Sequence, residues 1–408
     1  MTTAVRGGAG LVVVHLGRAD ARSVLVYGAG LVQGLALVSF PAASSILLSA
    51  SGYDLSTTQY GLMFVPQVVL AITGAATSPL LAAQWSLQRV LQVGLVSNLL
   101  AMLLLVLSQA VSTSPAAYPV LLCATGALGF GFGTTVPALN TFAARLRPAD
   151  QDRSILTLNA LLGTGTALAP LLIALFLALG AWWLLPVLAA AGLVMFLVLA
   201  LRTALDAGPA QQRTTGQRQK LPTRFWWYAT AAVLYGVCET LFGNWSSVYL
   251  TGERALSAQT ASLALAAFWA CVTLGRVIVA ALTTRVAATV VFVVLPVLIA
   301  ASNLAVSSSH GAVAAVLAFA AAGFACSAML PLTLSLAGEE FPRLGATSSG
   351  ELIAAYQVGY GFAAFGVAPL ESATGIGLAG VYLVGAGVAI VLAVIARVIT
   401  AGTPRPAT

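Results

Sequence analysis

Apolar segments long enough to cross a lipid bilayer follow one another along almost the whole chain. As helices of about 20 residues or more, they span the roughly 30 Å of hydrocarbon. Of the 408 residues, 60% are hydrophobic and 7% are charged, whereas roughly 25% of residues in soluble domains are charged. The sequence therefore predicts an all-α membrane protein with twelve transmembrane helices, at about 24–49, 59–82, 90–110, 118–143, 154–178, 181–201, 225–250, 260–284, 288–307, 312–337, 349–370 and 378–399.

The predicted helices fall into two groups of six, because the longest polar stretch, DAGPAQQRTTGQRQK, lies between the sixth and the seventh. A stretch of this composition is typical of a linker. The predicted organisation is a cytoplasmic N-terminal segment 1–23, a six-helix bundle 24–201, a cytoplasmic linker 202–224, a second six-helix bundle 225–399 and a cytoplasmic tail 400–408.

Basic residues give the expected orientation, because loops rich in Lys and Arg stay on the cytoplasmic side. All but two of the 18 basic residues lie on the side shared by both predicted termini and the linker, the exceptions being Arg254 and Arg276. Both termini are expected in the cytoplasm and the protein in the cell inner (cytoplasmic) membrane. The net charge of +7 does not indicate nucleic acid, since the basic residues form no patch interleaved with aromatics.

The second half of the chain repeats the first. Residues 31–48 and 233–250 share Gly, Phe, Ser, Ser and Leu at one constant offset, and the second copy has Glu239 where the first has Leu37. Residues 129–148 and 323–342 likewise share glycine, phenylalanine and two prolines at constant spacing. Two parallel six-helix repeats, with substrate and coupling sites near the midplane between them, are the arrangement of major facilitator transporters.

The chain resembles the major facilitator superfamily over nearly its whole length, and the stretch 235–276 resembles its fucose permease-like branch. The resemblance implies proton-driven uptake of a sugar or a similarly small polar solute by alternating access. The residues that carry the resemblance to the branch are Glu239, Trp245, Phe268, Trp269, Gly275 and Arg276.

Departures from the family pattern limit this inference. The loop between the second and third helices has Arg89 but lacks the Asp that usually precedes the Arg there. Related sugar transporters tend to carry carboxylates in helix one or four, whereas the most polar side chains here are Gln33 and Asn140. Proton coupling therefore depends on Glu239 alone or does not occur.

Glu239 is the predicted proton site, because an ionisable group within the hydrocarbon is costly and is by default a functional candidate. The alternative is a structural carboxyl group hydrogen-bonded to Tyr235, one helical turn away. Arg276, on the next predicted helix, is the second candidate for proton coupling. Three partners are open to Arg276: Glu239, Glu351, or the cytoplasmic headgroups reached by snorkelling.

Substrate contacts are predicted for polar and aromatic side chains at mid-membrane depth. The resemblance implies that Trp245 or Trp269 provides an apolar platform for a sugar ring, with hydrogen bonds from Asn244 and Gln357. The helical rise places Gln33 near the midplane as a further contact. The alternatives are interfacial anchoring for Trp245 and helix–helix hydrogen bonding for the amides.

A cytoplasmic gate is predicted from three side chains nearer the inner mouth. Asn140 and Asn159 lie on helices joined by a short loop, and Glu351 begins the eleventh helix. Hydrogen bonding between neighbouring helices is the alternative for both asparagines.

Other function classes are weakly supported. An enzyme would need a nucleophile, a metal cluster or a carboxylate pair, yet His15 and His310 both lie outside the predicted spans. We therefore expect no catalytic residues, no metal and no cofactor. The expected partners are a small-molecule substrate, protons or Na⁺, and the lipid bilayer, with the protein a monomer.

The competing function is proton-driven export of amphipathic drugs or metabolites. The side chains around Glu239 distinguish the two functions: amides and tryptophan favour a polyol, and a wide lining of Phe, Met and Leu favours a drug.

Overall fold

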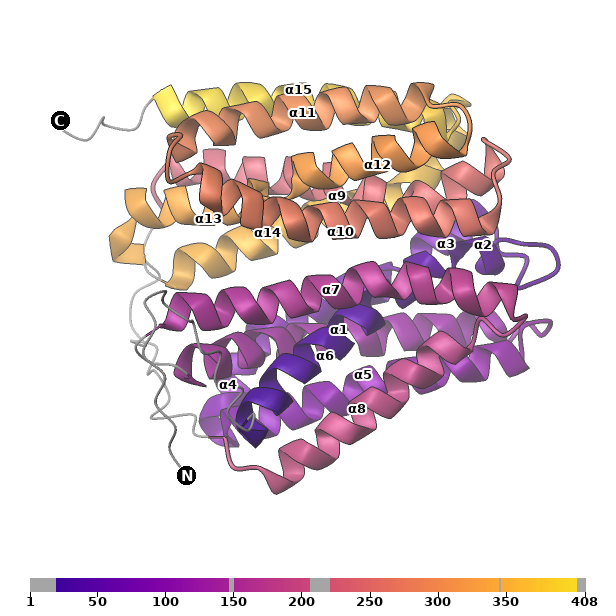
Figure 1. Cartoon of the computed structure of the whole chain (residues 1–408), viewed down its shortest axis with the longest axis horizontal. Helices are drawn as coiled ribbons and strands as arrows, with labels where there is room; N and C mark the ends of the chain where they lie inside the picture. Colours follow the sequence, from indigo (N-terminus) through magenta and orange to yellow (C-terminus); the bar gives the residue numbers. More distant parts are fainter. Residues whose placement is uncertain (1–19, 147–149, 206–220, 345, 402–408) are drawn as a thin grey trace, which may run out of the picture.

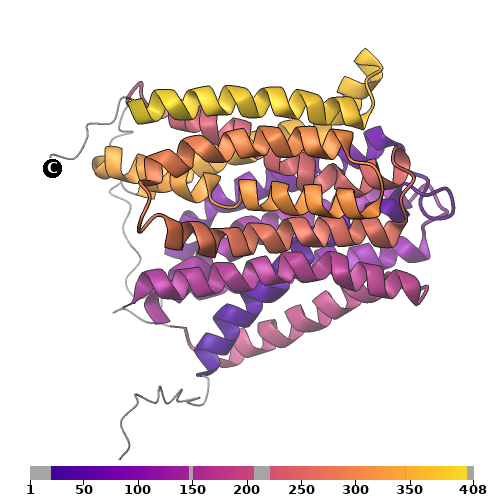
Figure 2. The same ribbon diagram turned by 45° about the horizontal axis from the view of Figure 1, so that its top comes forward.

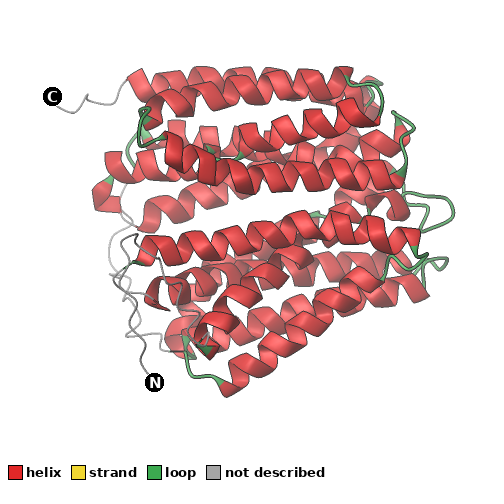
Figure 3. Cartoon of the chain, viewed as in Figure 1, coloured by secondary structure: helices red, strands yellow, loops and turns green. Residues whose placement is uncertain are grey.

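The structure is a computed structural model that describes residues 20–146, 150–205, 221–344 and 346–401. All the regular secondary structure in these residues is helical (Figure 3). The predicted N-terminal segment, linker and tail lie largely outside the described residues. The helices are α1 (Ala21–Ala42), α2 (Ser44–Leu47), α3 (Thr57–Leu62), α4 (Val65–Gln84), α5 (Leu87–Ala110), α6 (Ala117–Leu146), α7 (Gln151–Ala178), α8 (Leu184–Arg202), α9 (Phe225–Gly252), α10 (Ala258–Leu282), α11 (Ala288–Ser308), α12 (Ala312–Cys326), α13 (Met329–Glu340), the 3-10 helix η1 (Pro342–Leu344), α14 (Ala346–Thr374) and α15 (Leu378–Ala401).

Eleven of the predicted spans are long and apolar enough in the described structure to cross a membrane. The predicted all-α multi-pass membrane fold is confirmed at this level. The helix outside this set is α9, which has 28 residues and carries Glu239, Asn244 and several Trp and Tyr side chains. Its length is ample for about 30 Å of hydrocarbon, so its polarity and not its length separates it from the others.

Three of the spans are interrupted, and proline contributes to each interruption. Pro41 lies in the last turn of α1, before α2, and Pro66 lies in the first turn of α4, after α3. The third interruption separates α12 from α13, two residues before Pro331. Because proline has no N–H, Pro331 leaves the carbonyl of Ser327, four residues earlier, without its helical donor.

The helices form two packed groups that meet along a shared face (Figures 1 and 2). In the first group α1 packs on α7 and α6 packs on α4 and α5, whereas in the second α9 packs on α14, α10 on α12 and α11 on α15. The groups meet where α7 lies along α10, and where α3 and α4 contact α14. We call the end of the bundle where α1 begins and α15 ends the terminal end, and the opposite end, where α3 lies, the far end (Figure 1).

Glycine allows α9 and α14 to approach within backbone contact. A Cβ atom on Gly359 would lie 1.9 Å from the carbonyl oxygen of Val233, and one on Gly236 would lie 2.4 Å from that of Tyr356. Small residues at such a crossing allow helices in a membrane to pack closely. This contact fixes the position of α14 beside the carboxylate of Glu239.

Candidate functional site

A cavity of about 80 Å³ lies between the two groups of helices. It is lined by residues of α1, α4 and α6 on one side and of α9, α10 and α14 on the other. Ligand sites in transporters of this type form at such an interface between bundles. The lining residues are Leu37, Val38, Pro41, Gln67, Val68, Ala71, Gly129, Phe132, Asn244, Trp269, Tyr356, Gln357 and Tyr360.

The two walls of the cavity differ in chemistry. With the exception of Gln67, the wall from α1, α4 and α6 is apolar, and its largest side chain is Phe132. The wall from α9, α10 and α14 consists of two amides, two phenols and an indole. None of the lining residues in the described structure is charged. The predicted contacts Asn244, Trp269 and Gln357 therefore lie together at the cavity.

Two buried polar atoms of residues that line the cavity have no hydrogen-bond partner within the described protein. They are the carbonyl oxygen Oε1 of Gln67 and the indole Nε1 of Trp269. Buried polar groups in folded proteins are nearly always hydrogen-bonded, so an unpartnered acceptor and donor at one cavity are suited to a ligand or to water.

Tyr360 joins the two walls. Its hydroxyl oxygen accepts from Asn244 Nδ2 at 3.0 Å and from Gln67 Nε2 at 3.4 Å. Tyr60, on α3, also donates to the backbone carbonyl of Asn244 at 2.8 Å. The hydrogen bond to Tyr360 holds the Gln67 amide with Nε2 toward the phenol, and Gln67 Oε1 is left without a partner in the described protein.

Glu239 lies directly behind the polar wall and is 5% exposed. Its Oε1 is 2.7 Å from the hydroxyl of Tyr235, one turn earlier on α9, and its Oε2 accepts from the hydroxyl of Tyr356 at 2.5 Å. Tyr356 also lines the cavity. Glu239 is therefore hydrogen-bonded to Tyr356, a residue of the cavity wall.

Arg276 contacts backbone and not a carboxylate. Its Nε donates to the carbonyl of Ser327 at 3.2 Å, the carbonyl that Pro331 leaves without a helical donor. Among the described residues, no ion pair within 4.0 Å joins Arg276 to Glu239 or Glu351. The three partners considered from sequence did not include this backbone carbonyl.

Two predicted substrate contacts lie away from the cavity. Gln33 is fully buried within the first group of helices, where it exchanges hydrogen bonds with Asn98, which also bonds Thr135. Trp245 is 1% exposed, and its indole nitrogen donates to the carbonyl of Ala363 at 3.0 Å. Its burial also differs from the interfacial position that was the alternative prediction.

The predicted gate residues lie in two separate places. Asn159 Nδ2 donates to Asn140 Oδ1 at 3.3 Å, and both side chains also bond carbonyls of their own helices. This pair joins α6 to α7 within the first group of helices. Glu351 is exposed near the start of α14.

Sequence reasoning missed Gln67, Tyr356 and Tyr360 as cavity residues. Tyr356 and Tyr360 are one turn apart and flank Gln357 on α14, so their spacing could have placed all three on one side of the predicted helix. It also missed a cluster at the terminal end, where Arg224 and Tyr228 both donate to Glu340. The hydrogen bond to Glu340 raises the pKa of Arg224 above its ordinary value.

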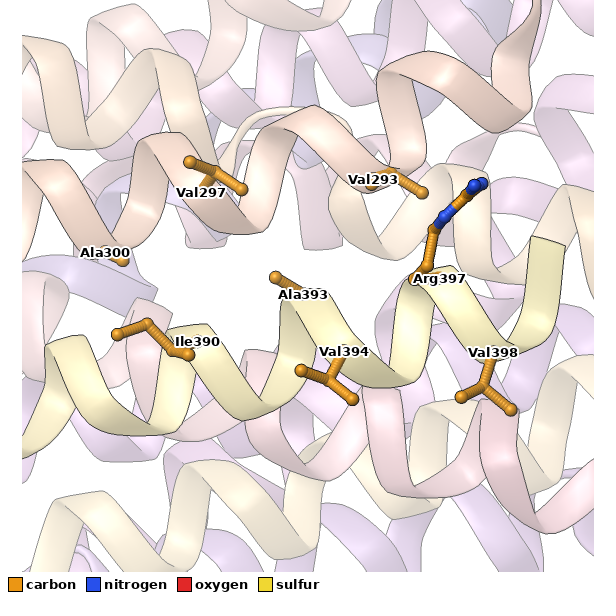
Figure 4. Close-up of a pocket in the computed structure, with 8 residues that line it drawn as sticks. All are labelled: Val293, Val297, Ala300, Ile390, Ala393, Val394, Arg397 and Val398. Carbon is orange, nitrogen blue, oxygen red and sulfur yellow. The ribbon is translucent and has the colours of Figure 1, made fainter. Parts of the chain in front are cut away.

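A larger hollow of about 390 Å³ lies between α11 and α15 (Figure 4). It is lined by Val, Ile and Ala side chains, with Arg397 toward one end. It presents no convergent polar groups, which a specific small-molecule site requires. We therefore place the candidate site in the smaller central cavity. No group of three metal-binding side chains occurs in the described ranges.

An all-helical multi-pass protein with a cavity between two packed groups of helices has the architecture of a membrane transporter. The chain belongs to the major facilitator superfamily, since a model of that family matches residues 26–369. The predicted superfamily is confirmed, and the protein is a transporter and not an enzyme.

Solved structures of transporters share the fold. The D-xylose-proton symporter matches with a TM-score of 0.77 at 12% identity, over 92% of this chain and 96% of that chain. A mutant of the nucleoside transporter NupG gives 0.76 at 16% identity, over 93% and 99%. The E. coli fucose:proton symporter FucP gives 0.60 at 17% identity, over 93% and 97%. At these identities the likeness shows the fold alone. No curated protein matches the sequence.

Proposed function

We propose that this protein is a proton-coupled secondary transporter of a small, uncharged, polar solute in the cytoplasmic membrane. The observation that carries the proposal is the connection from the central cavity through Tyr356 to Glu239, the one carboxylate that is buried among the described residues. The fold is shared with a D-xylose-proton symporter and a fucose:proton symporter, which supports this class of function.

The substrate class follows from the lining of the cavity. Amides, phenols and an indole on one wall suit hydroxyl groups, and the unpartnered Gln67 Oε1 and Trp269 Nε1 supply one acceptor and one donor. The apolar wall suits the apolar face of a sugar ring or of a nucleoside base. Because the lining includes no charged side chain in the described structure, a strongly charged solute would be buried without a counterion, which is costly.

The membrane orientation and the repeat belong to the same proposal. The bias of the basic residues favours a cytoplasmic terminal end, with α9 as a twelfth transmembrane helix. The corresponding pairs α1–α7 and α9–α14 support two repeats with boundaries near 24–201 and 225–399. Contacts of α3 with α14 at the far end favour a state that is closed toward the outside.

Coupling would operate through the charge state of Glu239. A carboxylate accepts hydrogen bonds from Tyr235 and Tyr356, whereas a protonated carboxyl group also donates one. Protonation therefore changes the hydrogen-bonding pattern at Glu239, whose other carboxylate oxygen accepts from Tyr356 of the cavity wall. The proton and the substrate would thus bind at neighbouring parts of one hydrogen-bond network.

Proton-driven export of an amphipathic compound remains the second candidate, because the first-group wall of the cavity is apolar and includes Phe132. A drug site would need a wide apolar lining on both sides, however, and the second wall is polar. Counterflow in proteoliposomes with a panel of sugars, nucleosides and hydrophobic dyes separates the two candidates. We expect exchange of a sugar or a nucleoside, and exchange of dyes alone would establish the exporter.

Glu239→Gln tests the coupling role. We expect this variant to lose uphill accumulation while it retains counterflow, because the amide preserves the shape of the site but does not titrate. Glu339→Gln, at an exposed position, is the matched control and should accumulate substrate normally. Uphill accumulation at the wild-type level in Glu239→Gln would rule out the coupling role. Replacing Na⁺ by choline, and separately adding a protonophore, identifies the coupling ion.

A further inference from the structure

Tyr235 lies between Glu239 and a backbone carbonyl of another helix. Its hydroxyl oxygen is 2.7 Å from Glu239 Oε1 and 2.9 Å from the carbonyl oxygen of Cys326. A phenol has one proton to donate, and a carbonyl oxygen can only accept. Both contacts can be full two-centre hydrogen bonds at the same time only if Glu239 is protonated and donates to Tyr235.

The Cys326 carbonyl belongs to the interruption between α12 and α13. Cys326 is the last residue of α12, and α13 begins at Met329. The last carbonyls of a helix lack helical donors and need other partners. Two side chains from other helices donate here: Tyr235 of α9 bonds Cys326, and Arg276 of α10 bonds Ser327.

We propose that Tyr235 is a positioning residue that transmits the protonation state of Glu239 to the interruption between α12 and α13. This inference rests on the proposed role of Glu239 in proton coupling. When Glu239 is ionised, Tyr235 donates its proton to Oε1, and the Cys326 carbonyl loses this donor. When a proton binds at Oε1, Glu239 donates to the oxygen of Tyr235, and Tyr235 donates its own proton to Cys326. Tyr356 donates to Oε2 in both states.

The surroundings favour Glu239 as the group that changes its charge. Arg276 stays charged, because a guanidinium is effectively never deprotonated in proteins, and phenols and thiols ionise at much higher pH than carboxyl groups. On α1, Arg22 and Tyr27 lie in the first two turns, and α2 has no titratable side chain. The titratable groups in this region are Tyr235 and Cys238 of α9, Arg276 of α10, Cys326 of α12, Tyr356 and Tyr360 of α14, and Tyr382 of α15, whose hydroxyl donates to the Leu241 carbonyl.

The consequence is mechanical. When Glu239 is ionised, Arg276 is the remaining side-chain donor that reaches this interruption from another helix in the described structure, and the hydrogen bond from Tyr235 of α9 to α12 is released. When Glu239 is protonated, Tyr235 of α9 again donates to the Cys326 carbonyl of α12. The angle between α12 and α13 can then respond to the proton that accompanies the substrate, which gives the second group of helices a pH-sensitive joint.

Isotope-edited infrared spectroscopy tests the relay directly. Cys326 is kept as the single cysteine through Cys123→Ser, Cys238→Ala and Cys271→Ala, and the protein is labelled with [1-¹³C]cysteine. The ¹³C carbonyl band then reports the hydrogen bonding of Cys326, and the carboxyl C=O band, identified by its loss in Glu239→Gln, reports protonation of Glu239. We expect the two bands to change together with pH in the parent protein.

Three variants complete the experiment. In Tyr235→Phe the Cys326 band should stay at the weakly bonded frequency at every pH, and in Glu239→Gln at the bonded frequency, because the amide always donates. Tyr356→Phe is the matched control, and it should retain the pH-dependent change. A Cys326 band that ignores pH while the Glu239 band titrates would overturn the relay and leave the proposed function standing. A Glu239 that never titrates would overturn both.

Transport by Tyr235→Phe in the unmodified background gives an independent measurement that needs no cysteine substitutions. We expect counterflow within about twofold of the parent and uphill accumulation reduced at least tenfold, since the protonation change no longer reaches α12. Accumulation by Tyr235→Phe at the parental level would show that Tyr235 does not transmit the proton signal.

Discussion

At the scale of single residues, the cavity is defined by a few polar atoms that the protein itself leaves without partners. Gln67 Oε1 and Trp269 Nε1 are buried, and each lies in a different wall of the cavity. The amide nitrogens of Gln67 and Asn244 are already engaged, because Tyr360 accepts from both. Substrate recognition is therefore expected to depend on Trp269 more than on Asn244.

Trp269→Phe should weaken substrate binding about fivefold, because it removes one donor, and a typical hydrogen bond contributes about 1 kcal/mol. Thermal stability should change little, since the donor has no partner in the described protein. Binding can be measured by tryptophan fluorescence or by calorimetry with the substrate found in counterflow. Trp226→Phe, at an exposed position on α9, is the control. Equal affinities for Trp269→Phe and the parent would show that the indole N–H does not contact substrate.

At the scale of elements, the contact between α9 and α14 decides whether Glu239 meets Tyr356. The two helices approach through Gly236 and Gly359, and each glycine faces a backbone carbonyl of the other helix. Overpacking a close contact costs typically about 1–3 kcal/mol. Any side chain at these positions would also move α14 away from the carboxylate.

Gly359→Ala should lower the melting temperature of the purified protein and reduce uphill accumulation. Its Cβ would lie 1.9 Å from the Val233 carbonyl oxygen, so the helices must separate. Gly366→Ala on the same helix is the matched control, because nothing lies within 4 Å of the added Cβ. A thermal-shift assay in detergent compares the two. A melting temperature for Gly359→Ala at or above that of Gly366→Ala would contradict the close contact.

The two repeats use their equivalent prolines differently. Pro137 and Pro331 occupy matching positions in the sequence, yet α6 continues through Pro137, whereas α12 and α13 are separated just before Pro331. The side chains of Tyr235 and Arg276 bond the carbonyls at the interruption between α12 and α13. Proline therefore permits an interruption, and the neighbouring helices determine where one forms.

At the scale of the whole molecule, a hydrogen bond and a ring contact join the two groups of helices at the far end. Tyr60 of α3 donates to the Asn244 carbonyl of α9, and its ring meets the ring of Trp245 edge to face, with centroids 5.4 Å apart. Gly61 lies against α14 beside this contact. Opening of the far end during alternating access requires this cluster to separate.

Tyr60→Phe should shift the equilibrium toward the state open at the far end by about 2- to 12-fold, since a net hydrogen bond contributes about 0.5–1.5 kcal/mol. Electron paramagnetic resonance distances between spin labels at Thr58→Cys and Ser372→Cys, both exposed on α3 and α14, measure the shift. Tyr118→Phe removes a hydroxyl that bonds within the first group of helices, and it serves as the control. Identical distance distributions in Tyr60→Phe and Tyr118→Phe would show that the bond does not hold the far end closed.

The sequence by itself determined the apolar spans, the superfamily and the carboxylate of Glu239 in the seventh predicted span. These are local properties, because a helix must satisfy its backbone and present apolar side chains to lipid wherever it crosses hydrocarbon. A single acidic residue within an apolar span is equally visible in the sequence, because an ionisable side chain in the hydrocarbon has a high free-energy cost wherever the span lies.

The tertiary structure alone decided which polar side chains meet at the cavity. Gln33 turns to Asn98 and Trp245 to Ala363, whereas Gln67, Tyr356 and Tyr360 face the centre. Arg276 bonds the Ser327 carbonyl and no acidic side chain among the described residues. The physical reason is that depth follows from counting residues along one helix, but the direction of a side chain depends on the rotation of that helix against its neighbours. Contacts between distant parts of the chain, such as Gly236 and Gly359 in the α9–α14 crossing, set that rotation.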